Sequence, residues 1–455
     1  MRLGRRTLLF AAIALALGLY IYLVEGPRLA EDQAPRRLLV FEPAQVSGLR
    51  LVYPDAPDIS AHRVDGTWRI TEPLQARADS AAIERLLSAI ANVELERMIG
   101  AGQRESLDVY GLDGNGSHAL VELTLEGGGD PLPPIIVGRT TPVGFSAFAR
   151  LADSPDIVVT PLLFHSGVKK SVFDLRNKSL FDFDPTHAIA MTIDGENGRI
   201  RLERRGDRWL ITSPTKGGAD RDVVAGILAS FNRITATALY EGKQIKRREF
   251  GLKRPTLSVE VEVGDSQVLG FKLGAQDPED SSSVFFERIP DGQVAKVAAG
   301  IKNGFDKSPD QLRDKRLFDC KADQVSRIQF VRDDGSRFVL VKHEDAWALE
   351  AAADQAVDQA AAGRLAASLT TLRGAATVGK DDDSRFGLDP PRVEVALWLA
   401  NGDSCGRGLG GRVESEGQAT RYFIKRAGHS AVMSVAEYLF SRIDRRVEDF
   451  LTVPR

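Results

Sequence analysis

Tryptophan recurs at one position in a segment that this chain contains three times. Trp68, Trp209 and Trp347 lie 141 and 138 residues apart. Each is followed eleven residues later by an aspartate, namely Asp79, Asp220 and Asp358. Self-similarity at a fixed period indicates a repeat architecture, so we expect three units of one fold. The length of 455 residues agrees with this expectation at about 150 residues per domain.

Each unit opens with a strand-turn-strand pattern that ends at its tryptophan. Asp65-Gly66 separates two apolar runs in the first unit, and Gly206-Asp207 does so in the second. Such dipeptides are turn residues of antiparallel hairpins. We therefore expect each tryptophan to cover a core from one face of a hairpin.

A helix is predicted directly after each of the three aspartates. Apolar residues fall 4, 7, 8, 11 and 14 positions beyond the aspartate in every copy, which is one face of a 3.6-residue helix. They are Ile83, Leu86, Leu87, Ile90 and Val93, then Val224, Ile227, Leu228, Phe231 and Ile234, then Ala362, Leu365, Ala366, Leu369 and Leu372. The aspartate is the expected N-cap, because its carboxylate can accept from unpaired backbone N–H groups.

The remainder of each unit is predicted to consist of half-buried antiparallel strands. An aromatic-Gly-Leu corner begins at Tyr110, Phe250 and Phe386, and strands with period-two alternation such as 259–263 follow it. The fold class is therefore α+β, with three tandem repeats of mainly antiparallel strands and one amphipathic helix each. The predicted units are 39–181, 182–318 and 319–455.

The N-terminus predicts a single transmembrane helix before these repeats. Leu8 to Val24 is an unbroken apolar run of seventeen residues, which reaches roughly 25 Å as a helix. Arg2, Arg5 and Arg6 precede it and favour a cytoplasmic N-terminus. We expect a cytoplasmic tail at 1–6, an anchor at 7–24 and a linker at 25–38. A cleaved signal peptide is the alternative, but its small-residue triplet around Leu15 lies in the middle of the run.

Composition and cysteine usage exclude several classes of protein. The net charge is −3 without a basic block, which gives nucleic-acid binding little electrostatic support. Only Cys320 and Cys405 are present, too few for a disulfide framework or a zinc site of their own. Cys320 falls where the other units have phenylalanine, which favours a small apolar core residue. An oxidising compartment would permit a bond between the two, and the sequence leaves this pairing open.

No catalytic, cofactor-binding or metal-binding residues are predicted. Ser166 and Lys169 have the S-x-x-K spacing of penicillin-recognising enzymes, but the S-D-N and K-T-G elements of such sites do not occur. The stretch from Asp113 to Ser117 begins like a calcium loop but has His118 and Thr124 where glycine and glutamate are needed. The six histidines are scattered in sequence, without a pair at metal-ligand spacing.

Five basic residues at the ends of the first two units are the candidate docking site. The closings read Leu-Arg-Asn-Lys in the first unit and Leu-Arg-Asp-Lys-Arg in the second. The residues are Arg176, Lys178, Arg313, Lys315 and Arg316. They could form an anion-binding or partner-docking row along one edge. The alternative is structural, in which the arginine pairs with carboxylates at the junction and fixes how neighbouring units stack.

The chain resembles the domain of unknown function family 4340. The resemblance rests on the N-terminal anchor, W-x-[IL]-[TE]-x-P segments at 68–73 and 209–214, the aromatic-Gly-Leu corner and a V-G-x-x-T-P hairpin at 137–142. The closing L-R-[ND]-K-x-L-F completes it, over residues 7 to 455. The resemblance implies an envelope-anchored bacterial protein that accompanies gliding-type ABC transport systems, and it offers no agreed catalytic residues.

These observations predict a non-enzymatic accessory or scaffold protein without a cofactor. The resemblance places it in the bacterial inner membrane as a single-pass protein, with a cytoplasmic N-terminus and most of the chain in the periplasm. Its expected partner is an ABC transporter permease, a companion subunit or another envelope complex. The alternative is a periplasmic ligand-binding module for glycan, lipid or peptide. A hydrolase site assembled from different repeats is a third reading.

Overall fold

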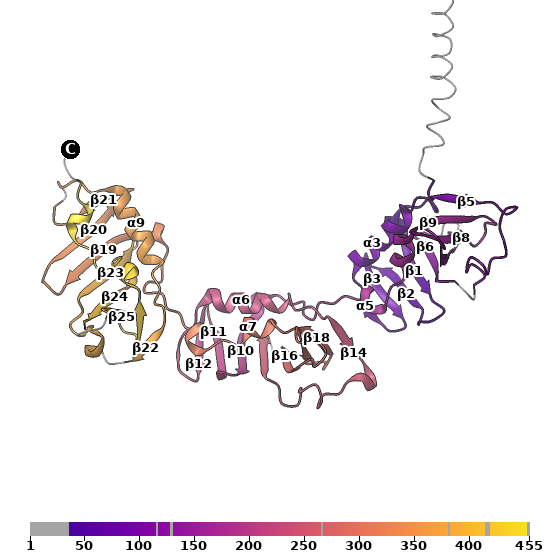
Figure 1. The fold of residues 1–455 in the computed structure, drawn as a ribbon. Helices are drawn as coiled ribbons and strands as arrows, with labels where there is room; N and C mark the ends of the chain where they lie inside the picture. The colour runs from indigo at the N-terminus through magenta and orange to yellow at the C-terminus, as the bar shows by residue number, and fades with distance from the viewer. Residues whose placement is uncertain are drawn as a thin grey trace, which may run out of the picture. The chain divides into compact units, whose positions relative to one another are not determined.

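The strands of this chain pair antiparallel in three separate sheets (Figure 1). The computed structural model describes residues 36–114, 117–127, 131–264, 267–352, 354–380, 383–414 and 419–452. The chain divides into two compact units, Met1–Ser179 and Leu180–Arg455, and the second contains two of the sheets. The prediction of an α+β fold with mainly antiparallel strands is confirmed.

The first sheet has nine strands. Their order is β4 (Ala76–Arg77), β3 (Thr67–Glu72), β2 (Ile59–Val64), β1 (Val46–Val52), β6 (Ala119–Leu125), β7 (Ile135–Thr140), β8 (Ser146–Leu151), β9 (Ile157–Pro161) and β5 (Arg97–Ile99). β2 and β3 are joined by the predicted turn, in which Asp65 and Gly66 both have positive φ, as a two-residue hairpin loop requires.

The second sheet also has nine strands, in the corresponding order. They are β13 (Gly217–Gly218), β12 (Arg208–Ser213), β11 (Gly198–Arg205), β10 (Ala188–Gly195), β15 (Leu257–Val263), β16 (Gln267–Gln276), β17 (Ser283–Ile289), β18 (Val294–Ala298) and β14 (Ala238–Tyr240). The side chains of β15 alternate between buried and half-buried, as the period-two pattern predicted.

The third sheet has eight strands, and the described residues include no counterpart of β4 and β13 in it. Its order is β21 (Ala346–Leu349), β20 (Arg337–His343), β19 (Val325–Arg332), β23 (Val393–Leu399), β24 (Ser404–Val413), β25 (Arg421–Arg426), β26 (Ala431–Val435) and β22 (Thr377–Lys380). All three sheets therefore place the first hairpin at one end and the strands that follow the aromatic-Gly-Leu corner toward the other.

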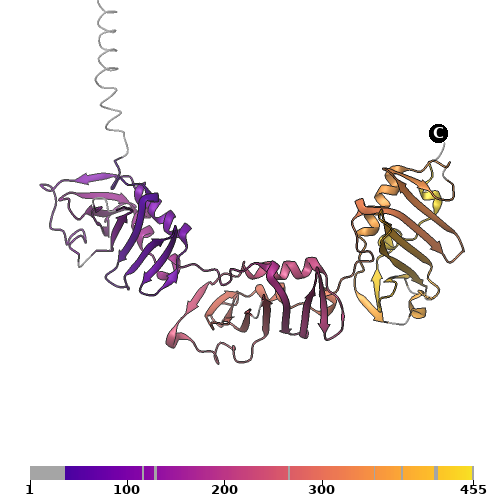
Figure 2. The same cartoon turned by 180° about the vertical axis from the view of Figure 1, so that it is seen from behind.

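One longer helix accompanies each sheet, and the three predicted caps are confirmed. The helices are α3 (Ser80–Ala91), α6 (Arg221–Phe231) and α9 (Gln359–Thr370). Asp79 accepts from the backbone N–H of Ala82 at 2.9 Å, and Asp220 and Asp358 cap α6 and α9 in the same way. Helix α6 lies along one side of the second sheet in both views (Figures 1 and 2).

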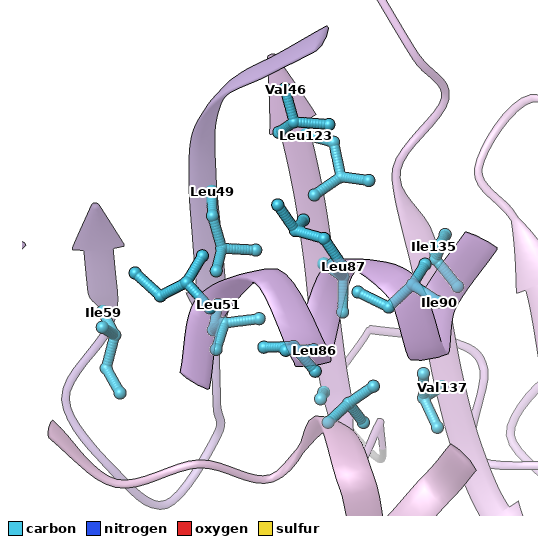
Figure 3. Packing of buried hydrophobic residues seen from close by; sticks show 14 of the residues in the cluster. Val46, Leu49, Leu51, Ile59, Leu86, Leu87, Ile90, Leu123, Ile135 and Val137 are labelled. Atoms are coloured by element: carbon cyan, nitrogen blue, oxygen red, sulfur yellow. The ribbon is translucent and has the colours of Figure 1, made fainter. Parts of the chain in front are cut away.

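The predicted apolar faces of these helices form the cores. All fifteen residues assigned to the three faces are buried, and so are the three repeated tryptophans. In the first unit, Leu86, Leu87 and Ile90 of α3 pack against Leu49 of β1 and Val137 of β7 (Figure 3). The helix therefore covers one face of its sheet, and burial of this apolar surface is the main stabilising contribution.

A glycine beneath the aromatic-Gly-Leu corner recurs in all three sheets. A Cβ atom on it would overlap the backbone carbonyl oxygen of the corner aromatic residue, so only glycine permits this approach. The pairs of glycine and aromatic residue are Gly138 with Tyr110, Gly274 with Phe250, and Gly411 with Phe386. The corner glycines Gly111, Gly251 and Gly387 have positive φ, which favours glycine at these positions.

Short helices close each unit. They are α4 (Leu162–Val168) and α5 (Val172–Leu175), then α7 (Ile301–Phe305) and α8 (Pro309–Leu312), then α10 (Glu437–Phe440). Single 3-10 turns complete the helical structure at η2 (Pro43–Gln45), η3 (Pro185–His187), η4 (Gly242–Gln244), η5 (Ala322–Gln324), η6 (Ser384–Phe386) and η7 (Val447–Phe450).

Cys320 and Cys405 form a disulfide bond, with their Cα atoms 5.6 Å apart. The expectation of a small apolar core residue at Cys320 is thus corrected, although its side chain does pack at the edge of the third core. Cys405 lies in β24, and its backbone carbonyl accepts from the N–H of Asp319 at 3.3 Å. This contact aligns the two segments so that the sulfur atoms meet.

The predicted anchor at 7–24, the tail at 1–6 and most of the linker lie outside the described residues. Within residues 36 to 452, apart from the gaps given above, none of the helices combines the length and apolar character needed to cross a bilayer.

Candidate functional site

The predicted docking residues of the first unit lie beside the cap of α3. The backbone of Arg176 forms an antiparallel bridge with Ala78, next to the N-capping aspartate. Lys178 places its Nζ 5.0 Å from the ring centre of Phe173 and donates to the carbonyl of Asp174 at 3.3 Å. The closing segment of the first unit therefore pairs with the backbone at the start of α3, which is a structural reason for its position.

The corresponding residues of the second unit make contacts within their own chain. Arg313 bridges to Ala219 and donates from Nη2 to Thr215 Oγ1 at 3.2 Å. Lys315 Nζ lies 2.7 Å from Asp310 Oδ2. These two basic groups are thus held by neighbouring polar groups.

Arg316 is the most firmly paired of the five. Its Nε and Nη2 donate to the two carboxylate oxygens of Asp314 at 2.9 and 2.8 Å, and Asp319 lies 3.6 Å from Nη1. The hydrogen bond with Asp314 is the main cause of a raised pKa of Arg316. These ion pairs agree with the structural alternative. The docking role of the five residues stays a prediction, and the five are divided between the two compact units.

Ser166, the serine of the S-x-x-K match, lies on α4. Its Oγ donates to the backbone carbonyls of Leu162 and Leu163 at 3.1 and 3.2 Å. The hydroxyl is engaged with the preceding turn of its own helix, which is the usual position for a helical serine.

A polar pocket of about 520 Å³ lies in the first unit, where α4 meets the start of β6 and the end of β7. His118 and His165 stack inside it, with ring centres 3.7 Å apart and planes at 22°. Lys169, the C-cap residue of α4, also lines the pocket and forms a 3.1 Å ion pair with Asp55. Arg139 completes the cationic part of the lining.

Burial controls the protonation of the stacked imidazoles. It lowers the pKa of His118 below its ordinary value, and the positive charge of Lys169 lowers it further. Burial and then the neighbouring His118 lower the pKa of His165. The Nε2 atom of His118 is buried and has no hydrogen-bond partner among the residues that the structure describes. A buried polar atom without a hydrogen-bond partner is uncommon, which makes this pocket a candidate binding site.

The sequence does not predict this pocket. His118 and His165 are 47 residues apart in the sequence, and neither the spacing nor the local pattern links them. They meet because β6 lies beside β1 in the sheet, while α4 packs against β7, β8 and β9, the strands that follow β6. The usable signal was a comparison of one position in the three closing segments, which holds a basic residue, Lys169, in the first and an acidic one, Asp306 and Asp444, in the other two.

Exposed apolar side chains gather at the hairpin between β7 and β8. Val143 and Phe145 are 88% and 86% exposed. The carbonyl of Phe145 accepts from the N–H of Leu162 at 2.8 Å, which holds the hairpin against the start of α4, where Leu163 is 82% exposed. We call Val143, Phe145 and Leu163 the hairpin cluster. Adjacent exposed apolar residues of this size are typical of interaction surfaces, whereas scattered single ones are ordinary.

Each antiparallel sheet is covered by a capped helix and has a glycine beneath an aromatic corner. These features define a class of α+β protein whose recurring residues, the caps, glycines and aromatic corners, have structural roles. The model of one family, domain of unknown function 4340 (DUF4340), matches residues 68–216 and again 209–391. The chain belongs to this family. Both matches begin at a repeated tryptophan, Trp68 and Trp209. No curated protein matches the chain.

Proposed function

We propose that this chain is a non-enzymatic, single-span accessory protein of the bacterial envelope. In this proposal the described residues lie outside the cytoplasm, and the first unit docks onto an ABC-type transport system or another envelope complex. The hairpin cluster is the observation that carries the proposal. The three large apolar side chains, each at least 82% exposed, lie on two segments that are joined by the backbone hydrogen bond between Leu162 and Phe145, and a partner would cover them.

The proposal includes three copies of one module in series. The shared strand order of the three sheets supports it, and so do the three aspartate caps and the two family matches that start at tryptophan. Repeated modules offer an extended surface, which suits binding more than catalysis. The anchor is supported by the apolar run from Leu8 to Val24 and the arginines before it.

Replacing Phe145 and Leu163 by serine is expected to reduce recovery of the partner at least tenfold. A central aromatic contact in an interface contributes about 2 kcal/mol, and each 1.4 kcal/mol is a factor of ten in affinity. The measurement is affinity capture of the full-length protein from crosslinked native membranes, with quantitative mass spectrometry of transporter subunits. The substitutions are at exposed positions, so folding is expected to be unchanged.

The matched control is Tyr438→Ser, because Tyr438 is 70% exposed but lies in α10, which closes the third unit. It is expected to leave recovery unchanged. Equal recovery with the double variant and the wild type would count against docking through the hairpin cluster. Equal loss with the control would show that any exposed apolar residue affects recovery, which would also count against it.

The ligand-binding alternative is favoured by one observation, the pocket beside His118. This pocket lies inside the first unit. Arg139 and Lys169 line this pocket, and these cationic groups do not suit a purely lipid ligand. The alternative therefore reduces to a ligand with an anionic group.

A further inference from the structure

One residue near each closing helix occupies an equivalent place in all three sheets, six positions before the residue whose backbone carbonyl accepts from the N–H of the aspartate that caps α3, α6 or α9. Lys169 is the C-cap residue of α4, Asp306 is the C-cap residue of α7, and Asp444 comes four residues after α10. Each contacts the connection that follows the first strand of its sheet or the end of that strand. The position therefore ties the closing helix to the first hairpin.

In the second sheet this position holds a carboxylate surrounded by donors. Asp306 accepts from the backbone N–H of Glu196 at 3.4 Å and from Nδ2 of Asn197 at 3.3 Å, and Lys302 Nζ lies 4.0 Å away. Its side chain is only 7% exposed. The carboxylate is thus nearly buried and compensated by groups of its own unit.

The third sheet repeats the arrangement with arginines. Asp444 forms an ion pair with Arg332 and lies 3.0 Å from Nε of Arg392. Burial opposes ionisation of this carboxyl, but the hydrogen bonds from the two arginines hold the pKa of Asp444 below its usual range. Arg392 directly precedes β23, as His118 directly precedes β6. The second and third sheets therefore both place a carboxylate opposite donors here.

The first unit has the donors without that carboxylate. Lys169 stands at the position of the aspartates, and His118 and His165 lie beside it in an open pocket. Asp55 is the one carboxylate in the lining, but the side chains of Asp55 and Lys169 are 63% and 47% exposed. An ion pair this exposed is weak, so Lys169 can be shared with another anion.

We propose that this pocket binds a carboxylate group of an external ligand. The ligand's carboxylate takes the place that Asp306 fills beside the second sheet and Asp444 fills beside the third. Lys169 and Arg139 would supply positive charge, and the two imidazoles would add to it when they are protonated. Hydrogen bonds between ionised partners are about twice as strong as neutral ones. This site lies beyond the docking role proposed above and does not depend on it.

Binding of the carboxylate is coupled to protonation of the histidines. Free, the stacked rings lose protons at lower pH than an ordinary histidine, mainly because of burial. A bound anion stabilises the protonated form and so raises both pKa values, which means that affinity increases as pH falls. The charged groups that face the rings are Asp55 from the loop after β1, Arg139 from β7 and Lys169 after α4.

The test is a titration of the full chain in detergent with N-acetylalanine, whose carboxylate is the only difference in charge from N-acetylalanine amide. The six histidines are labelled with 13C at Cε1 and followed by NMR, and the two resonances are assigned with His118→Gln and His165→Gln. We expect saturable shifts at His118 and His165 with a dissociation constant on the order of 1 mM. The amide should cause none, and both pKa values should rise with the carboxylate bound.

Lys169→Asp recreates the residue of the other two sheets and should abolish the shifts. Lys169→Gln, which adds no negative charge beside Asp55, should weaken binding at least fivefold and covers the case in which the first variant misfolds. Lys170→Gln is the matched control, since Lys170 does not line the pocket, and should bind as the wild type does. Equal shifts with acid and amide, no saturation, or unchanged binding by Lys169→Gln would overturn the proposal.

Discussion

Reduction of the bond between Cys320 and Cys405 is expected to lower the free energy of unfolding of the third-sheet region by about 4 kcal/mol. The bond closes a loop with a sequence separation of 85 residues, and a loop of that length restricts the unfolded chain by about this amount in the chain-entropy model. Cys405 is 3% exposed and packs in the core, so its replacement also removes buried contacts. The measurement is urea unfolding followed by circular dichroism, with and without reductant.

The double variant Cys320→Ser and Cys405→Ser provides the control for this effect. It should unfold at the midpoint of the reduced wild type, within the small cost of the serine hydroxyls, and should not respond to reductant. A wild type whose midpoint is the same with and without reductant, after the thiols are shown to be free, would contradict the expected contribution of the bond. The same bond is expected to form in an oxidising compartment, which agrees with the proposed location.

The second large effect is expected from Gly274→Ala, which should lower the free energy of unfolding by about 3 kcal/mol. The added methyl group would overlap the carbonyl oxygen of Phe250. That carbonyl also accepts from the N–H of Ala275 at 2.8 Å, so moving it away breaks a backbone hydrogen bond. Neither partner can relax cheaply, because Phe250 packs in a buried cluster with its ring 4.0 Å from that of Phe285. Hydrogen exchange of the amides in β15 and β16 measures the loss locally.

Gly226→Ala is the matched control for the same chemical change. Gly226 lies on the exposed side of α6, and a Cβ atom there meets nothing within 4 Å. Alanine favours a helix over glycine by about 0.5–1 kcal/mol, so this variant should be slightly more stable than the wild type. If the amides of β15 and β16 are as protected from hydrogen exchange in Gly274→Ala as in the wild type, the corner can adjust to the added methyl group. That result would contradict our account of the repeated glycine.

The helices and cores were predictable because they depend on local periodicity. The apolar face of α9, with two alanines among its four positions, is weaker in itself than that of α3, yet all four residues are buried, and so is the fifth predicted residue, Leu372, which follows the helix. The helix after Asp358 was predictable because the same apolar spacing recurs after Asp79 and Asp220. The caps were predictable for the same reason, because the N-cap carboxylate acts on N–H groups two or three residues away.

The disulfide, the pocket and the hairpin cluster depend on contacts between distant segments. The cysteines meet because β24 pairs beside β23 and brings Cys405 to the segment before η5. The stacking of His118 on His165 requires the position of α4, which no local pattern specifies. Leu163 lies in an apolar stretch of the sequence, and only the fold shows that it is exposed next to the residue that pairs with Phe145.

Site-specific photocrosslinking tests the central claim most directly. A benzophenone amino acid replaces Phe145 in one sample and Tyr438 in another, in the full-length protein in native membranes. Our account predicts that position 145 forms an adduct with a membrane-spanning transporter subunit or another envelope protein, and that position 438 forms none with that protein. A lack of protein adducts at 145, or the same adducts from both positions, would contradict docking through the first unit.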